Sequence, residues 1–446
     1  MPSTVFDSAI FRDQFGTPAM RAVFADDSFV AKATAVEVAL AKVQGRLGII
    51  PADAAGEIAA KARPDAIDLS RLKTETDNVG YPVVGLVHQL AELCGEAGRY
   101  LHWGATTQDI IDTATVLQVR EAFGLIAADL AAIDAAVAGL AAKHRATVMA
   151  GRTHLQHALP ITFGHKAAVW LAMMRRHRER LEQLKPRVLV GQLAGAAGTL
   201  ASLGSRGLEV HDALMEELGL GGPAMPWHAA RDGLAEAVGW LGLVTGSLAK
   251  IATDVMLLMQ SEVGEAFEPF AAGRGGSSTM PQKRNPISSE LIVALAKVVR
   301  QQAGLMLDAM VADHERATGA WQIEWVALPQ AFIASAGALG QARFMLAGLV
   351  VEPERMRRNL DVTGGLIVAE AVMMALARHI GRGAAHDTVY AACRQAAAKG
   401  TPLLEELAKM EEVTRHFDRA ALERLVDPQN YLGVAPQMID RVLGRT

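Results

Sequence analysis

The stretch VLQVREAFGLIAADLAAIDAAVAGL, residues 116–140, carries apolar residues at alternating steps of three and four. The series consists of Val116, Val119, Phe123, Ile126, Leu130, Ile133, Val137 and Leu140. This spacing places the side chains on one face of an α-helix and predicts an apolar seam of roughly 35 Å, at about 1.5 Å per residue. The spacing recurs over 29–47, before the helix-stopping Gly48 and Pro51, and over 234–258. Long helices bury such seams against one another, so the sequence predicts a helical bundle.

We expect an all-α fold, because no convincing run of alternating apolar and polar residues predicts a strand. Loops rich in Gly and Pro divide the chain, and Pro353 begins a separate helical segment. The predicted domains are an N-terminal helical domain over 1–108, a central bundle of long helices over 109–350, and a C-terminal helical domain over 351–446.

Composition excludes several classes of protein. The 446 residues are 51% hydrophobic and 21% charged, which favours a folded chain with a large core. A net charge of -4 gives no basic excess for nucleic acid or an anionic membrane. The apolar stretch 332–351 contains Gln341 and Arg343, so we predict a buried helix rather than a membrane span. Two distant cysteines and the lack of a signal peptide lead us to expect a reducing cytoplasm.

The loop GRGGSSTMPQKRNP, residues 273–286, interrupts the helical pattern and carries the chemistry. Its glycines let backbone N–H groups converge on an anion, although the spacing is not that of a P-loop. Lys283 and Asn285 are suited to bind a carboxylate. Among such donors a serine alkoxide is favoured enough to remove a proton from carbon. The alternative for a loop of this composition is a surface loop with solvated charges.

The stretch GSSTMPQKRNP, residues 276–286, resembles the signature of the fumarase/aspartase superfamily, G-S-S-x-M-P-x-K-x-N-P, at every fixed position. Three further stretches extend the resemblance over nearly the whole chain. HWGATTQDIIDTA at 102–114 and GRTHLQHALPITFG at 151–164 resemble the first and second substrate-binding regions, and 355–372 is similar to a C-terminal stretch of adenylosuccinate lyases.

The resemblance implies a cofactor-free reaction. Members remove a proton from the carbon next to a carboxylate and expel a group from the adjacent carbon, through a doubly negative aci-carboxylate that preorganised donors stabilise. Ser277 would be the base, with Ser278 as the alternative, on a loop that closes over the substrate. Lys283 and Asn285 would hold the substrate carboxylate.

His154 and Glu290 are the predicted acid pair. In adenylosuccinate lyases the matching residues pair and the histidine protonates the leaving amine, since a carboxylate raises the basicity of an imidazole. His157 lies three residues further on, and we expect the two histidines on one helical face. The alternative for each is a hydrogen-bonded, partly buried histidine. Metal binding is a weak interpretation, because no third ligand lies nearby.

The remaining site predictions are substrate-binding residues. His102 aligns with a substrate-contacting histidine of the adenylosuccinate branch, and the TTQD segment is equally well explained as a helix cap. Arg316 is equally well explained as a surface ion pair. The full predicted set is His102, Thr106, Thr107, Gln108, Arg152, Thr153, Lys283, Asn285 and Arg316, with no metal.

The nearest likeness is to the 3-carboxy-cis,cis-muconate cycloisomerase branch, which lactonises a small tricarboxylate during aromatic degradation. DNVGYPVV, PWHAARD, GEAFEPFAAGRGGSSTMP, HERATGAWQIEW and NYLG carry it. Expelling a carboxylate needs no acid, whereas an amine does, so the presence of His154 and Glu290 keeps open a C–N or C–O lyase on a dicarboxylate. An inert scaffold is the third interpretation, against which the intact loop argues.

The resemblance also implies an assembly. Superfamily members are homotetramers whose central bundles merge into a twenty-helix core, and separate subunits supply the three signature stretches to each active site. The alanine-rich faces allow such close packing, but they suit an internal bundle equally well. No nucleic acid or membrane partner is expected.

Overall fold

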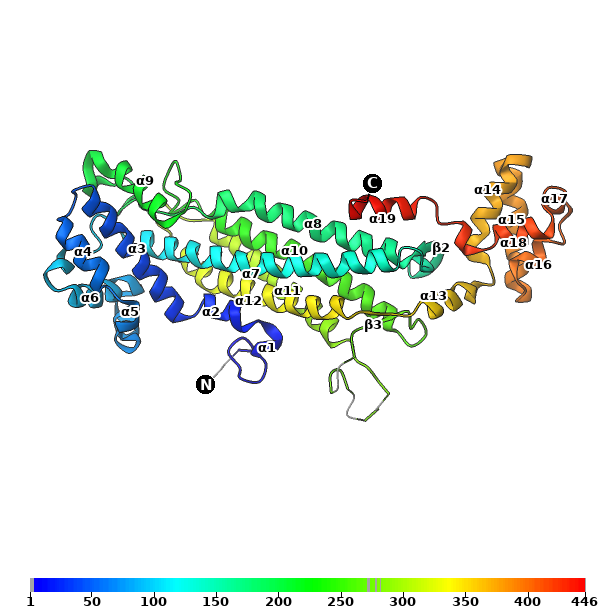
Figure 1. The fold of residues 1–446 in the computed structure, drawn as a ribbon, viewed down its shortest axis with the longest axis horizontal. Helices are drawn as coiled ribbons and strands as arrows, with labels where there is room; N and C mark the ends of the chain where they lie inside the picture. Colours follow the sequence, from blue (N-terminus) through cyan, green and yellow to red (C-terminus); the bar gives the residue numbers. More distant parts are fainter. Residues whose placement is uncertain (1–3, 271–272, 277–278, 281, 446) are drawn as a thin grey trace. The chain divides into compact units, whose positions relative to one another are not determined.

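The computed structural model describes residues 4–270, 273–276, 279–280 and 282–445. Long helices carry the apolar seams (Figure 1): α7 (Thr107–Lys143), α8 (Phe163–Val188), α10 (Asp232–Met259), α11 (Ile287–Ala309) and α12 (Ala320–Ala347). The predicted seam of 116–140 lies inside α7, and none of its apolar side chains is more than 9% exposed. The helices predicted over 29–47 and 234–258 are likewise confirmed, as α3 (Asp26–Arg46) and α10.

The internal contacts of the chain divide it into two compact units. Unit 1 comprises Met1–Leu130, His177–Ala249 and Leu291–Gln341; unit 2 comprises Ala131–Arg176, Lys250–Glu290 and Ala342–Thr446. Every boundary falls inside a long helix, so each unit contains part of all five named above. The three-domain division at 108/109 and 350/351 remains a prediction.

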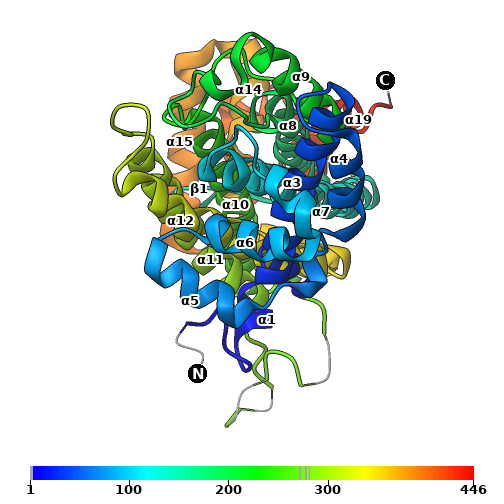
Figure 2. The same cartoon turned by 90° about the vertical axis from the view of Figure 1, so that its left-hand side faces the viewer.

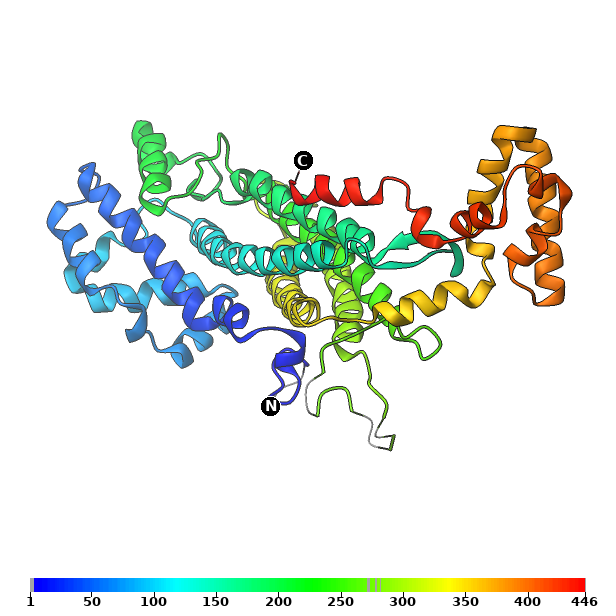
Figure 3. The same cartoon turned by 45° about the vertical axis from the view of Figure 1, so that its right-hand side comes forward.

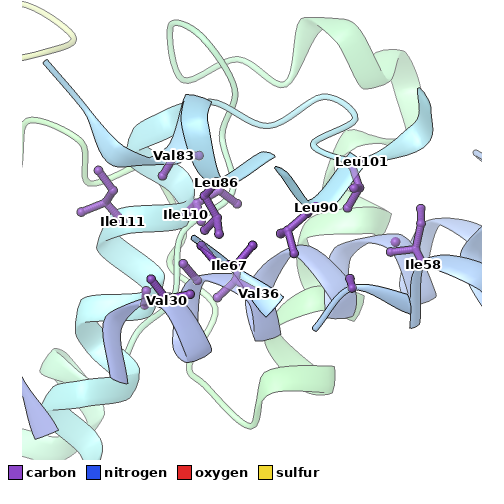
Figure 4. Packing of buried hydrophobic residues seen from close by; sticks show 14 of the residues in the cluster. Val30, Val36, Ile58, Ile67, Val83, Leu86, Leu90, Leu101, Ile110 and Ile111 are labelled. Atoms are coloured by element: carbon purple, nitrogen blue, oxygen red, sulfur yellow. The ribbon is translucent and has the colours of Figure 1, made fainter. Parts of the chain in front are cut away.

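In unit 1 the shorter helices of the first hundred residues gather around α3 (Figure 2). They are α1 (Arg12–Phe15), α2 (Pro18–Val23), α4 (Ala52–Lys61), α5 (Leu69–Val79) and α6 (Pro82–Cys94), with α9 (Gly207–Leu218) from later in the chain and the 3-10 turns η1 (Pro64–Ala66), η2 (Gly95–Tyr100) and η3 (Ala201–Arg206). Figure 4 shows the core that α3, α4 and α6 share with the start of α7: Val36 of α3 and Leu86 of α6 pack with Ile110. This core fixes the position of residues 102–108, which lead into α7.

In unit 2 the C-terminal helices form a second apolar cluster, with α14 and α15 side by side (Figure 3). The predicted segment begins at Pro353 as expected. Its helices are α13 (Pro353–Leu360), α14 (Ala369–Ile380), α15 (Arg382–Lys399), α16 (Leu403–Leu407), α17 (Glu411–Thr414), α18 (Arg419–Leu425) and α19 (Ala435–Leu443), with 3-10 turns η4 (Asp361–Thr363), η5 (Leu366–Val368) and η6 (Pro428–Asn430).

The all-α class is confirmed, but the described residues also form two small two-stranded sheets. β1 (Val148–Thr153) pairs antiparallel with β2 (Gln156–Thr162), and β3 (Ala266–Phe267) pairs with β4 (Val350–Val351). The expectation of His154 and His157 on one helical face is wrong. His154 and Leu155, at φ 52 and 63, form the two-residue turn of the β1–β2 hairpin, and His157 lies on β2 opposite Arg152.

Judged by length and composition alone, α7 and α10 are long and apolar enough to cross a membrane. The bent pair Pro353–Thr363 and Leu366–Ile380 also meets this criterion when the two helices are counted as one segment. The predicted buried helix over 332–351 is confirmed up to Ala347 as part of α12, and Phe332, Leu339 and Met345 are fully buried.

Candidate active site

Asp109 organises the first signature stretch in unit 1. Its carboxylate is fully buried and accepts four hydrogen bonds. Oδ1 accepts from the backbone N of Ala194 at 2.9 Å and lies 2.8 Å from His228 Nε2. Oδ2 accepts from the backbone N of Thr106 at 2.9 Å and of Gly195 at 3.0 Å. One carboxylate therefore holds the start of α7 against two other loops.

Thr106 and Arg316, 210 residues apart, meet at this helix start. Arg316 Nη2 donates to Thr106 Oγ1 and to the backbone oxygen of Ala196, both at 3.1 Å. Asp313 closes the loop that carries Arg316 by accepting from the backbone N of Thr318 at 2.9 Å. A guanidinium beside the positive end of a 37-residue helix is chemically suited to bind a carboxylate.

Thr107 and Gln108 differ in accessibility. Thr107 opens α7 and is half-buried. Gln108 is fully buried, and its Nε2 donates to the backbone oxygen of His228 at 2.9 Å. The side chain of Gln108 therefore fixes the start of α7 to the loop that contains His228. The helix-cap interpretation of TTQD accounts for the hydrogen bond from the backbone N of Thr106 to Asp109.

His102 forms a pair with a carboxylate that sequence reasoning did not assign. Its Nδ1 lies 2.6 Å from Glu37 Oε1, and its backbone N donates to Glu37 Oε2 at 3.1 Å. Glu37 is fully buried, whereas 23% of the His102 side chain is exposed. Burial lowers the pKa of His102, but the hydrogen bond and charge of Glu37, with a smaller contribution from Asp109, raise it above the ordinary value overall. Because Nδ1 faces Glu37, Nε2 donates a hydrogen bond to an anion when the ring is protonated.

A buried ionic network lies beneath this stretch and was also missed. Arg231 Nη1 and Nη2 bind the two oxygens of Asp112 at 2.7 and 2.9 Å, and Nε binds Glu324 Oε1 at 2.8 Å. Trp321 Nε1 donates to Asp112 Oδ1 at 3.2 Å. Burial lowers the pKa of Arg231, but the two carboxylates raise it well above its ordinary value. The phrase PWHAARD, which holds both His228 and Arg231, was the available signal.

The second signature stretch is the β1–β2 hairpin of unit 2. Thr153 and His154 are exposed at its tip. Arg152 donates through Nη1 and Nη2 to the two oxygens of the fully buried Glu265, at 2.8 and 2.7 Å. Nη1 and Nη2 of Arg152 are thus already directed at a carboxylate of the same chain, whereas Thr153 and His154 are the exposed predicted residues of this stretch.

The third signature stretch is described in part, and Ser277 and Ser278 lie outside the described residues. The backbone N of Asn285 donates to the oxygen of Gly275 at 2.9 Å. Gly275 has φ +69, and a Cβ there would lie 2.7 Å from the Asn285 oxygen, so this close approach requires glycine. Lys283 is exposed and Asn285 half-buried.

Glu290 is exposed in the first turn of α11. Within the described residues no hydrogen bond joins it to His154. The resemblance places the three stretches of one site on separate subunits, so the predicted acid pair remains a prediction.

In unit 1 the contact between Arg316 and Thr106 and the pair of His102 with buried Glu37 offer donors suited to an anionic substrate. Comparison with known protein families identifies the family of the chain. Residues 14–300 match the Lyase family and 365–442 match the Adenylosuccinate lyase C-terminus. The chain belongs to this lyase family of the fumarase/aspartase superfamily and is an enzyme, a lyase or cycloisomerase of that superfamily.

Three known proteins illustrate the similarity. A crystal structure of fumarate lyase from Mesorhizobium sp. BNC1 is 54% identical, with a TM-score of 0.92 over 97% of this chain and 99% of that one. Trans-aconitate decarboxylase 1 of Mycosarcoma maydis is 49% identical over 100% of this chain and 90% of its own length. A 3-carboxy-cis,cis-muconate cycloisomerase of Pseudomonas aeruginosa is 45% identical over 99% of this chain and 97% of its own.

Proposed function

We propose that the chain is a 3-carboxy-cis,cis-muconate cycloisomerase. The observation that supports the proposal is the contact of Arg316 with Thr106 at the start of α7, because a guanidinium at a helix start is suited to hold a carboxylate that the reaction does not alter. The relative of this name in Pseudomonas aeruginosa, which aligns end to end with the chain, supports the same substrate class.

In the lactonising direction a carboxylate of the substrate adds to the adjacent double bond, and the carbon next to the second carboxylate takes a proton. In reverse, Ser277 removes that proton, the electron pair moves into the neighbouring carboxylate to give the aci-carboxylate dianion, and the ring carboxylate leaves. Lys283 and Asn285 hold the charged carboxylate, while Thr106, Thr107, His102 and Arg316 hold the rest of the substrate. No cofactor takes part.

The second candidate is a C–N or C–O lyase that releases fumarate or a related unsaturated acid. The observation in its favour is the exposed His154 at the hairpin tip, because an amine leaves only with a proton and a leaving carboxylate needs none. Glu290 would orient this histidine. The solved fumarate lyase, similar to this chain over nearly its full length, supports the same alternative.

A panel of substrates separates the candidates. The chain is mixed with 3-carboxy-cis,cis-muconate and the loss of ultraviolet absorbance is followed; aspartate N-adducts are assayed for the appearance of fumarate, and trans-aconitate for loss of carbon dioxide. We expect turnover of the muconate. Turnover of an aspartate adduct or of trans-aconitate alone would refute the cycloisomerase assignment, and the variant Ser277→Ala is the negative control in every arm.

We further propose a cytoplasmic homotetramer with shared active sites. A hollow of about 620 Å³ in unit 1 has Trp240, Leu243, Leu307 and Met310 in its lining, beside charged residues such as Arg187 and Glu236. Leu243 and Leu307 are 55% and 63% exposed. A second copy of the chain would cover this apolar surface. Light scattering should give the mass of four chains, which Leu307→Asp lowers and Leu208→Asp, at an exposed site outside the hollow, does not. A wild-type monomer that turns over substrate would contradict the proposal.

A further inference from the structure

The segment Gly264–Phe270 of unit 2 connects two of the signature stretches. It contains β3 and carries two buried carboxylates, Glu265 at 0% and Glu268 at 5% exposed. Two buried acidic side chains three residues apart are costly unless each is fully paired. Each of them is paired, and each with a different stretch.

Glu265 holds the hairpin. Both of its oxygens accept from Arg152, which lies two residues before His154, and Oε1 also accepts from Asn359 Nδ2 at 2.7 Å. Asn359 donates as well to the backbone oxygen of Val263 at 2.8 Å. The two-residue turn at the tip needs this support, because left-handed backbone at His154 and Leu155 costs about 1–2 kcal/mol for each residue that is not glycine.

Glu268 holds the two ends of the signature loop. Its Oε1 accepts from the backbone N of Ser289 at 2.8 Å and from Ser289 Oγ at 2.7 Å, and Oε2 accepts from the backbone N of Ser288 at 3.1 Å. Both backbone N–H groups lie in the first turn of α11, where N–H groups have no acceptor within the helix, so the Glu268 carboxylate pairs them and stabilises the helix through its dipole. The backbone oxygen of Glu268 accepts from Arg284 Nη2 at 3.0 Å.

We propose that Glu265 and Glu268 are positioning residues that fix the His154 hairpin and the ends of the signature loop to one strand. Neither carboxylate has an oxygen free for substrate, so both act through the groups they hold. Arg152 belongs to the same arrangement, as the hairpin's anchor. The consequence for catalysis rests on the proposed function, whereas the structural part of the inference does not.

The structural part is tested by hydrogen–deuterium exchange of the purified full chain. Glu265→Gln should speed exchange in 148–162 by about 10-fold and leave the first turn of α11 unchanged, and Glu268→Gln should do the reverse, because each lost charged hydrogen bond releases only its own segment. The matched control is Glu262→Gln, two residues before this segment, whose side chain is exposed. Equal acceleration throughout unit 2, or none beyond the control, would overturn the inference.

The catalytic part uses whichever substrate the wild-type chain turns over. Glu265→Gln should lower kcat roughly 10- to 100-fold with KM nearly unchanged, since displacement of a reacting group affects the transition state most. The double variant Arg152→Met/Glu265→Gln removes both charges and should restore the melting temperature but not kcat. Recovery of kcat in the double variant would show that Glu265 only neutralises Arg152, and would overturn positioning. If the wild-type chain turns over no substrate in the panel, the proposed function fails while the exchange result still decides this inference.

Discussion

Asp109→Asn tests whether one buried carboxylate holds the first signature stretch together. Each Asp109 oxygen accepts two of the four hydrogen bonds: Oδ1 from Ala194 and His228, Oδ2 from Thr106 and Gly195. Asparagine has the same shape, but one oxygen becomes an amide nitrogen that cannot accept. If the amide nitrogen replaces Oδ2, the backbone N of Thr106 and of Gly195 lose their acceptor; if it replaces Oδ1, the backbone N of Ala194 does, because His228 Nε2 can accept from the amide in its other tautomer. At about 1.5–3 kcal/mol for each hydrogen bond to a charged group, the loss is about 1.5–6 kcal/mol.

The assay for Asp109→Asn is the free energy of unfolding from urea denaturation, with hydrogen–deuterium exchange over 102–108 and 194–200. Asp308→Asn is the control, because Asp308 is exposed in unit 1 and its replacement should change stability by less than about 0.5 kcal/mol. A loss for Asp109→Asn as small as that of the control, with unchanged exchange in both loops, would refute the reasoning.

Three further predictions concern other parts of the site. Gly275→Ala should break the hydrogen bond from Asn285 to Gly275, because a methyl group there meets the Asn285 oxygen at 2.7 Å, and amide exchange at Asn285 measures the effect. Gly276→Ala should leave that amide protected, because no atom of the described residues lies within 4 Å of its added carbon. Protonated His102 stabilises the folded chain below its unfolded pKa of about 6.5, and this contribution is lost as the pH rises through its raised folded pKa. Glu37→Gln should therefore reduce the decline in the free energy of unfolding over this pH range. Urea titrations at pH 5.5–8.5 measure the decline, and an identical slope in the variant would count against the pair. Arg316→Met should raise KM by roughly 10- to 100-fold through loss of a charged contact to the substrate, whereas Arg300→Met, at an exposed position of α11, should not; equal KM values would remove Arg316 from the site.

The helices could be predicted because their physical cause is local. The steps of three and four over 116–140 indicate which face of the helix is buried. Gly48, at φ +67, follows the end of α3 at Arg46, close to the predicted end of that helix at residue 47. The hairpin could not be predicted in this way. A two-residue turn is normally predicted from glycine or asparagine, but here His154 and Leu155 occupy the left-handed positions.

In the candidate site, too, some residues could be predicted from the sequence and others could not. Thr106 and Arg316 were predicted separately and meet in the structure, although 210 residues apart. The supporting carboxylates Asp109, Glu37 and Glu265 were missed, because a buried acidic residue inside a helix or beside a short strand looks in sequence like any solvated one. Only the tertiary fold supplies the donors that make each of them structural.

The most direct test of the account is the turnover of 3-carboxy-cis,cis-muconate by the wild-type chain and by Ser277→Ala, with binding of the substrate to each measured by calorimetry. The account predicts that the serine variant still binds the substrate and that its turnover is lost, because only the hydroxyl that takes the proton from carbon has been removed. Turnover by the variant at a rate near that of the wild-type chain would contradict it.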